Sequence, residues 1–375
     1  MKQTGTVFVT AIGSFSAGAV ITACRRDGYR VVGCDIYPAE WVVSSMDVDK
    51  FYQAPYATDK AAYRMFIKEI CSRETVDYLM PLTDVEIDVL QEWRLENPEE
   101  VSSLGAVVCI SDAEAISLCR NKEACAAALE ELGACRTIPG YKLAELLPLI
   151  DAYKRQDGDG ADWLEKWKKA GWESPEPWSY PLVLKPLDGR SSQGLQIIET
   201  WPQMVYAAEQ CRNQADRYLI QPRIQGMVVT VDVVRNPETG DCECLPRREL
   251  LRTLNGAGTS VQVFRNRQLE SCCRKIAEIL NVRGCVNFEF IESERKPMAA
   301  ASGLEALPVW YFLECNPRFA GGVAFSCEAG YDMIRNHLNC FTGQPLEKMG
   351  QIQDQYIARR YTEYRMKEET NDKKA

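Results

Sequence analysis

Histidine is nearly absent from this sequence, which has only His337 among its 375 residues. This scarcity excludes a metal site built on several histidines, and it leaves one possible centre for a Ser-His or Cys-His catalytic pair. His337 falls in a segment with helical spacing, residues 332–341, where we expect a structural role. The sequence therefore points to chemistry that does not depend on histidine.

Cysteine pairs with the spacing of zinc ligands are also lacking. The sixteen cysteines are scattered, and none belongs to a Cys-x-x-Cys motif. The close pairs Cys242/Cys244 and Cys272/Cys273 are too tightly spaced to serve as zinc ligands. We interpret the cysteines as small buried hydrophobic residues in a reducing compartment.

The chain has neither an excess of positive charge nor a long apolar run. A net charge of -9 argues against nucleic acid as the main partner, although Arg247, Arg248 and Arg252 form a local basic group. No segment approaches the roughly 18 apolar residues of a membrane span, and no signal peptide is recognisable. We therefore expect a cytoplasmic protein without nucleic-acid or membrane partners. The sequence leaves open whether the protein forms a homodimer.

Apolar strands alternate with amphipathic helices in the N-terminal part of the chain. The expected strands are residues 6–10, 29–34, 78–81 and 106–110, and the expected helices are residues 19–26, 59–72 and 86–97. This alternation predicts an open α/β domain over residues 1–115, with a parallel sheet covered on both faces. Ligands bind such sheets outside the carboxyl ends of the strands, where Asp35 and Asp84 lie. Asp84 is a candidate substrate contact, but we favour it as the cap of the next helix.

The rest of the chain is predicted to be an α+β region. Its expected strands are residues 182–185, 195–198, 218–221, 228–235, 285–291 and 310–314, and its expected helices are residues 112–120, 123–132, 269–280 and 331–340. Residues 151–178 hold half of the eight tryptophans, and we interpret them as an inserted helical excursion, with a substrate lid as the alternative. The last ten residues, 366–375, are mostly charged and are expected to be disordered.

A lysine followed by a loop rich in glycine and serine is the first candidate for nucleotide chemistry. Lys185 ends an expected strand, and the loop after it contains Gly189, Ser191, Ser192 and Gly194. Glycine lets backbone N–H groups approach an anion closely, and lysine adds a point charge suited to phosphate. Taken alone, the pattern fits an ordinary β-hairpin turn equally well.

Acidic and amide side chains on two expected strands indicate a magnesium site. Glu314 and Asn316 share one face of their strand, and Asn287 and Glu289 share one face of the preceding strand. If the strands pair, the two glutamates meet, and a cation between them relieves the cost of burying two carboxylates. Arg318 can then neutralise charge on a transferring phosphoryl group. The alternatives are a simple edge strand with a turn, and a glutamate that faces solvent.

Two further segments are candidate binding elements. A strand running into a turn at residues 218–226 can present backbone groups to a flat heterocycle, although a plain strand end is the preferred interpretation in isolation. Arg248 and Arg252 can bind a substrate carboxylate through a guanidinium fork. A solvated basic strand is the equally weighted alternative.

Together, these segments resemble a known superfamily. The motifs in order are Lys122 after a helix, Leu-Lys185-Pro with its loop, Ile-Gln221-x-x-Ile-x-Gly226, Asn-x-Glu289, and Glu314-x-Asn316-Pro-Arg318. This ordered set, over about residues 5–345, resembles the ATP-grasp superfamily, and within it the carbamoyl-phosphate-synthase-like group that includes biotin carboxylase-type enzymes. The Glu-x-Asn-Pro-Arg motif is its most specific part, and the glycine loop is the least specific.

The resemblance implies roles for the matching residues. The implied ATP contacts are Lys122, Lys185, Gly189, Ser191, Ser192, Gly194, Gln221, Pro222, Arg223 and Ile224. Glu289, Glu314 and Asn316 would hold one or two Mg²⁺ ions. Arg318, with Lys185, would stabilise the transition state that leads to an acyl phosphate.

Two positions depart from the pattern of the family. Pro222 stands where a glutamate is frequent, so one contact near the adenine must come from the backbone. Met227 and Val228 stand where a glutamate usually reaches the ribose, and Asp232 is the candidate to replace it.

The resemblance implies an ATP- and magnesium-dependent ligase that activates a carboxylate and joins it to an amine. It implies a pre-ATP-grasp domain over residues 1–115, an ATP-grasp domain over residues 116–345, divided near residue 220, and a C-terminal extension over residues 346–375. A catalytically silent ATP-binding regulator is the main alternative. An NAD(P)-dependent oxidoreductase, suggested by Gly13, Gly18 and Asp35, is a weaker one because the turn lacks a full Gly-x-Gly-x-x-Gly.

Overall fold

The computed structural model describes residues 4–131, 136–154, 180–187, 194–253, 256–293 and 309–366. The chain forms two compact units. The first unit consists of Met1–Arg120, Val229–Glu289 and Glu314–Ala375, and the second consists of Asn121–Val228 and Phe290–Leu313. Residues 155–179 of the tryptophan-rich segment, loop residues 188–193 and the tail from residue 367 lie outside the described residues. The domain boundaries expected at residues 115 and 345 stay predictions.

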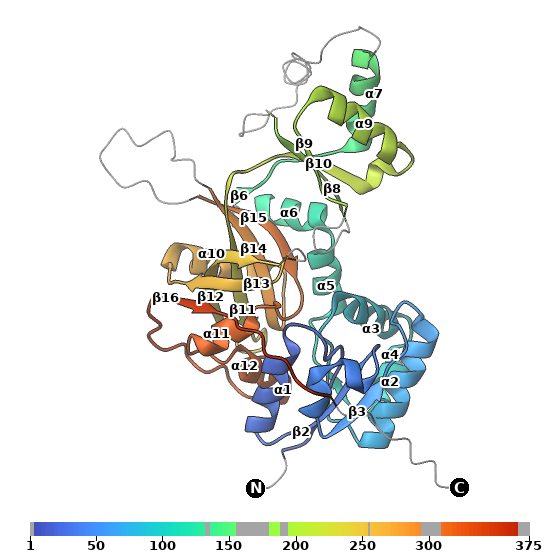
Figure 1. The fold of residues 1–375 in the computed structure, drawn as a ribbon, viewed down its shortest axis with the longest axis vertical. Helices are drawn as coiled ribbons and strands as arrows, with labels where there is room; N and C mark the ends of the chain where they lie inside the picture. Colours follow the sequence, from blue (N-terminus) through green and yellow to red (C-terminus); the bar gives the residue numbers. More distant parts are fainter. Residues whose placement is uncertain are drawn as a thin grey trace. The chain divides into compact units, whose positions relative to one another are not determined.

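A parallel sheet of five strands forms the N-terminal part of the first unit (Figure 1). Its strand order is β3 (Lys50–Gln53), β2 (Arg30–Asp35), β1 (Thr6–Val9), β4 (Tyr78–Met80) and β5 (Val107–Val108). Successive side chains of β1 enter different cores, because Val7 and Val9 pack in one cluster and Phe8 packs in another. All three are fully buried, so the sheet is covered on both faces. This confirms the predicted open α/β fold.

Helices cover this sheet, and one of them corrects an expectation. The helices are α1 (Ala17–Arg26), α2 (Lys60–Glu74), α3 (Asp84–Glu96), α4 (Pro98–Ser102) and α5 (Ala113–Arg120). We expected Asp84 to cap α3, but the N-cap residue is Thr83, and Asp84 is the first helical residue. Glu86 completes a capping box by accepting a hydrogen bond from the Thr83 amide at 3.2 Å. The side chain of Asp84 is therefore left for other contacts.

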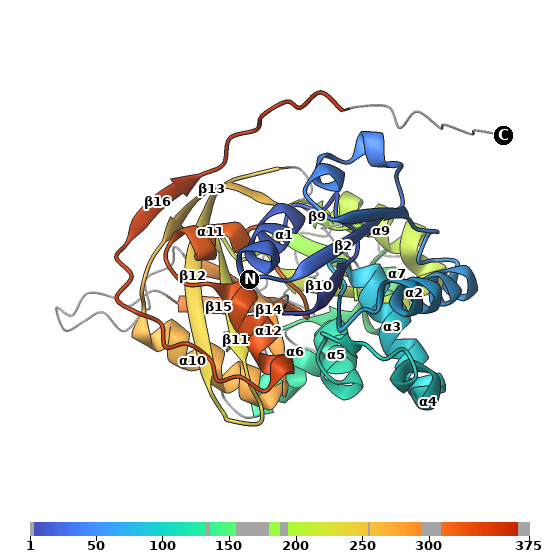
Figure 2. The ribbon, with the colours of Figure 1, turned by 90° about the horizontal axis from the view of Figure 1, so that it is seen from below.

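The α+β region contains a sheet of seven strands (Figure 2). The order is β16 (Gln355–Ala358), β13 (Gly258–Val263), β12 (Cys242–Arg252), β11 (Gly226–Arg235), β14 (Gly284–Ser293), β15 (Val309–Asn316) and β6 (Arg136–Thr137). Strands β11, β12, β13 and β16 pair antiparallel in succession, whereas β6 is parallel to β15. The helices of this region are α10 (Arg267–Ile279), α11 (Val323–Glu328) and α12 (Met333–Thr342).

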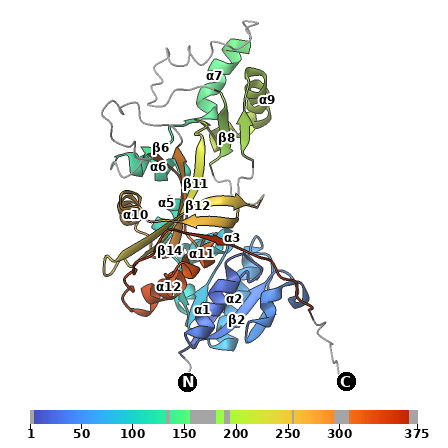
Figure 3. The same cartoon turned by 60° about the vertical axis from the view of Figure 1, so that its left-hand side comes forward.

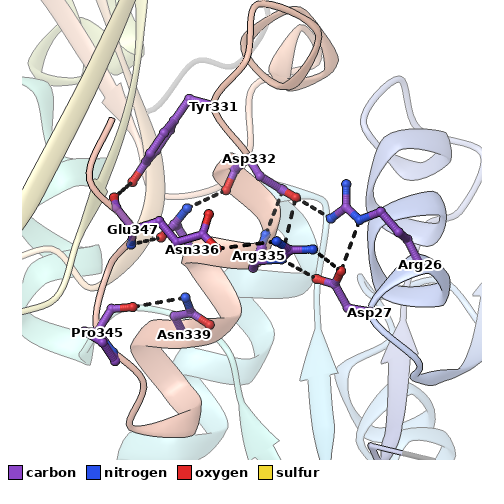
Figure 4. A network of polar contacts seen from close by, with 9 residues as sticks. All are labelled: Arg26, Asp27, Tyr331, Asp332, Arg335, Asn336, Asn339, Pro345 and Glu347. Atoms are coloured by element: carbon purple, nitrogen blue, oxygen red, sulfur yellow. Dashed lines mark hydrogen bonds and ion pairs between the residues drawn. The ribbon is translucent and has the colours of Figure 1, made fainter. Parts of the chain in front are cut away.

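A charge network joins α1 to α12 within the first unit (Figure 4). Arg335 on α12 bonds Asp27, which follows α1, with 2.5 Å between Nη2 and Oδ1. Arg26 on α1 bonds both Asp27 and Asp332, the N-cap of α12. Although burial alone would raise the pKa of Asp27, hydrogen bonds from Arg335 and Arg26 lower it. The alternating charges hold the two helices side by side.

The second unit is built on an antiparallel sheet of four strands (Figure 3). Its order is β7 (Tyr141–Lys142), β10 (Tyr218–Pro222), β8 (Leu182–Pro186) and β9 (Gln196–Ile198). Helices α7 (Leu143–Lys154) and α9 (Trp201–Cys211) pack on each other and bury Leu146, Met204 and Ile220 in one core. The unit also contains α6 (Lys122–Glu131) and a 3-10 helix, η3 (Arg212–Arg217). None of the helices described here is long and apolar enough to cross a membrane.

Candidate active site

The candidate metal residues lie on neighbouring strands of the first unit. Glu289 is on β14, and Glu314 and Asn316 are on β15, next to β14 in the sheet. The Asn316 amide Nδ2 donates to Asn287 Oδ1 at 3.2 Å and to Glu314 Oε1 at 3.4 Å. Burial and the nearby charge of Glu314 raise the pKa of Glu289. The structure thus brings the two carboxylates together, while their role as metal ligands stays a prediction.

This set of donors fits magnesium. Two carboxylates and one amide supply hard oxygen atoms, and Mg²⁺ commonly completes its shell with water and phosphate oxygens. Burial is the main cause of the raised pKa of Glu289, and the nearby charge of Glu314 adds to it. Arg252 lies nearby, with 3.4 Å between its Nη2 and Glu289 Oε2. Within the described ranges, no group of three or more His, Cys, Asp and Glu residues gathers as a metal cage.

Arg318 contacts the parallel-sheet part of the first unit. Its Nε and Nη2 donate to Asp84 Oδ2 at 3.1 and 3.0 Å. Asp84 also lies 3.5 Å from Arg120 Nη1. The first residue of α3 is thus the anionic partner of Arg318, which leaves the predicted contact between Asp84 and substrate without support. Sequence reasoning missed this pair because the two residues are far apart in the chain.

The two arginines predicted to form a guanidinium fork have separate partners. Arg248 Nη1 donates to Gln262 Oε1 at 3.2 Å, and its guanidinium stacks 4.0 Å from the centre of the Phe264 ring. Arg252 donates from Nε to the Gly256 carbonyl at 2.8 Å and reaches Glu289. Pairing between β12 and β13 shifts register between Glu249 and Arg252, so the usual period of two no longer places both arginines on one face.

A third arginine of the same strand is buried with two acids. Arg247 Nη1 lies 2.5 Å from Asp232 Oδ2, and its Nε lies 3.1 Å from Glu249 Oε1. Although burial alone would lower the pKa of Arg247, the two carboxylates raise it. Asp232 has no exposed side-chain surface and also accepts from Ser326 Oγ at 2.6 Å. This environment argues against the predicted contact of Asp232 with ribose.

The predicted phosphate-binding residues belong to the second unit. Lys185 lies on β8 opposite Leu219 of β10, and Lys122 is the first residue of α6. Gly194 has a φ of +74°, a conformation that favours glycine. Gly189, Ser191 and Ser192 lie outside the described residues. Phosphate binding by this set stays a prediction.

The predicted adenine contacts surround the end of β10. Gln221 is buried, and its Nε2 donates to the Ile138 carbonyl at 2.7 Å. Pro222 ends the strand, and the Arg223 amide donates to the Pro181 carbonyl at 3.2 Å. Gly226, the first residue of β11, lies very close to the backbone of β14. A Cβ atom at this position would lie 2.1 Å from the Glu292 carbonyl oxygen. The strand end therefore needs glycine at this position, and adenine contact by Gln221 and Ile224 stays a prediction.

Comparison with known proteins gives a family match for part of the chain and a fold for most of it. The model of the family described as "ATP-grasp in the biosynthetic pathway with Ter operon" matches residues 214–364, which include Glu289, Glu314 and Arg318. The biotin carboxylase domain of 2-oxoglutarate carboxylase from Hydrogenobacter thermophilus, described as a dimer in complex with MgADP, ADP and bicarbonate, is similar in structure. The TM-score is 0.67 at 17% identity, with 94% of this chain and 74% of that one covered.

Two further solved structures share the architecture. A biotin carboxylase from Campylobacter jejuni has a TM-score of 0.64 at 17% identity, covering 91% of this chain and 72% of that one. The N5-carboxyaminoimidazole synthetase from Staphylococcus aureus, complexed with ADP, has a TM-score of 0.64 at 15% identity, covering 92% and 79%. A sequence comparison with curated proteins finds no match.

The fold is that of the ATP-grasp enzymes, with an N-terminal parallel sheet followed by antiparallel sheets. Residues 214–364 match an ATP-grasp family model and the chain shares the ATP-grasp fold, and both findings agree with the resemblance seen in the order of its motifs.

Proposed function

We propose that this protein is an ATP- and magnesium-dependent ligase that joins a carboxylate to an amine. The observation that carries the proposal is the meeting of Glu289 and Glu314 on neighbouring strands, with Asn316 beside them. Two carboxylates and one amide in this arrangement suit a divalent cation that also holds phosphate oxygens. Arg318 adds a guanidinium in the same segment of chain.

The proposed reaction has two transfers. A carboxylate oxygen of the substrate attacks the γ-phosphorus of ATP, so a new O–P bond forms, the bond to ADP breaks, and an acyl phosphate results. The amine nitrogen then attacks the acyl carbon and releases its proton to solvent, and phosphate leaves with the electron pair of the broken C–O bond. Positioning and charge neutralisation supply most of the catalysis in such transfers.

The residues of this chain have distinct proposed parts. Lys122, Lys185 and the loop with Gly189, Ser191, Ser192 and Gly194 hold the ATP phosphates, and Gln221, Pro222, Arg223 and Ile224 contact the adenine. Glu289, Glu314 and Asn316 hold Mg²⁺, which when bound neutralises phosphate charge. Arg318 stabilises charge on the transferring phosphoryl group, and Asp84 fixes its guanidinium.

The test is a screen for turnover with paired substrates. Full-length protein is incubated with ATP, MgCl₂ and panels of carboxylates and amines, and ADP release is followed. A condensed product is identified by mass spectrometry as the sum of both substrates minus one water. Glu314→Gln should lower kcat/KM by at least about 100-fold, or ~2.7 kcal/mol, while Glu328→Gln, an exposed glutamate of the same unit, serves as the matched control.

Two results would contradict the proposal. Near-normal turnover in Glu314→Gln would remove the metal assignment. ATP that raises the melting temperature without turnover for any pair of substrates would instead support a silent nucleotide-binding role.

We also propose a homodimer, because the biotin carboxylase domain of similar fold is described as a dimer. Light scattering on the purified chain tests this point, and a monomeric mass over the working concentration range would refute it.

A further inference from the structure

A cavity of about 350 Å³ opens at the carboxyl ends of strands β1, β2 and β4 in the first unit. Pockets for small molecules fall in roughly the range of 300–1,000 Å³ and are mostly apolar with a few placed polar groups. The apolar wall contains Ile36, Tyr37, Pro55, Tyr56, Tyr63 and Val85. The cavity therefore has the size and wall of a site for a small molecule with an apolar or aromatic body.

The charged groups of this cavity are acidic. Asp35 and Glu86 line it, and none of its lining residues, all of which belong to the described chain, is a lysine, arginine or histidine. Asp35 Oδ2 accepts from the Gly13 amide at 2.7 Å, and Glu86 Oε1 accepts from Tyr63 at 3.1 Å. Two carboxylates without a lining cation favour a positively charged ligand group and disfavour a carboxylate or phosphate.

The start of helix α3 does not reverse this preference. Helix N-termini attract anions because their first N–H groups lack partners within the helix. Here Thr83 and Glu86 form a capping box at that end, with 2.7 Å between Thr83 Oγ1 and Glu86 Oε2. The anion that satisfies this terminus is thus part of the protein.

Aromatic side chains and an unusual backbone surround the cavity. Tyr37 and Tyr56 line it and are 48% and 63% exposed, and the ring of Trp41 lies 6.0 Å from that of Tyr37. The faces of tyrosine and tryptophan attract cations. Ala11, also in the wall, has a φ of +48°, which is uncommon for a residue other than glycine and is frequent at functional sites.

The cavity shares a segment of chain with the candidate active site. Thr83 and Val85 line it and flank Asp84, whose carboxylate holds Arg318. The same turn of α3 therefore contributes to the cavity wall and positions the arginine that we assign to phosphoryl transfer.

We propose that this cavity binds the amine substrate, as a primary ammonium on an aromatic or aliphatic body, and not the carboxylate substrate. The inference rests on the proposed ligase function, because it identifies the site of one of its two substrates. The tyrosines hold the apolar body, and Asp35 and Glu86 provide the negative field for the ammonium.

Binding without ATP tests this inference separately from catalysis. Three probes of similar shape, 2-phenylethylamine, 2-phenylethanol and 3-phenylpropanoate, are titrated into the full-length protein by calorimetry. We expect the amine to bind at least about 10-fold tighter than the alcohol, with no measurable binding of the carboxylate. Carboxylate binding equal to that of the amine, or failure of all three probes to bind, would overturn the assignment.

Matched variants locate the bound amine. Tyr56→Ala should weaken amine binding, while Tyr206→Ala, which removes a tyrosine of similar exposure (66%) from the second unit, should not. Glu86→Gln keeps the shape of the capping box and should weaken the amine about 10-fold without changing the alcohol, with exposed Glu99→Gln as its control. Equal effects of a variant and its control would refute the site. Intact amine binding in a protein that never turns over ATP would refute only the ligase proposal.

Discussion

The only histidine of the chain should make the folded protein sensitive to mild acid. His337 lies on α12, is 5% exposed, and packs between Phe319 and Phe341 at 4.7 and 5.0 Å between ring centres. Its Nδ1 accepts a hydrogen bond from the Cys285 amide at 2.9 Å, so the ring is neutral with its proton on Nε2. Protonation of Nδ1 would break this bond and place a charge in an apolar core.

The size of the effect follows from the two pKa values. Burial lowers the pKa of His337 to about 3 in the folded protein, against about 6.5 in the unfolded chain. The unfolded state therefore binds more protons between these values, and stability rises with pH up to about 6.5 and falls as the pH drops below it. Between pH 7 and pH 5, this single group should cost about 2 kcal/mol of unfolding free energy.

Urea unfolding at pH 7, 6 and 5 measures this cost, with His337→Asn as the reference. The asparagine Oδ1 can replace Nδ1 as an acceptor but does not titrate, and every other group is common to both proteins. The wild type should lose about 2 kcal/mol more than the variant over this interval. Parallel pH profiles, or a His337 proton resonance in the folded protein that titrates near pH 6–7, would refute the reasoning.

The remaining predictions concern buried charges of the first unit. Asp84→Asn should lower ATP turnover at least about 10-fold, because Arg318 loses the anion that fixes it. Asp88→Asn on the same helix is the control and should have a smaller effect. Equal effects of the two variants would contradict a positioning role for Asp84. Arg247→Met should lower the unfolding free energy by about 3–5 kcal/mol in urea titrations, since two carboxylates are left buried without their cation, and a change below ~1 kcal/mol would contradict this account.

The main strands and helices could be predicted because their residues are periodic. The continuous apolar run of β1 and the helical spacing of α12 both place apolar side chains in a core, and the predicted elements overlap the observed ones. Helices α7 and α9 and strands β12 and β13 were missed. Pro148 lies inside α7, where proline normally signals the end of a helix, whereas Pro202 in the first turn of α9 is compatible with a helix start. Packing of α7 on the four-stranded sheet overrides that signal.

The candidate site could be predicted only where one strand carries the pattern. Glu314 and Asn316 share a face because they are two residues apart, and no knowledge of the fold is needed. The pairing of Arg318 with Asp84 depends on the tertiary fold, which local spacing does not contain. The contact of Arg252 with Glu289 lies beside a register shift between β12 and β13, which sequence spacing does not reveal. The acidic cavity arises from short segments that converge at one sheet edge, so no linear motif marks it.

The way the chain is divided between the two compact units has a practical consequence for dissecting the protein. The backbone passes from one unit to the other four times, after Arg120, Val228, Glu289 and Leu313. Three of these passages fall inside strands β11, β14 and β15. No single truncation can therefore release either unit as a continuous piece, and a fragment ending near residue 220 would lack the strands that carry both glutamates. Expression of isolated halves should give insoluble or unfolded material, so the activity is best sought in the intact chain.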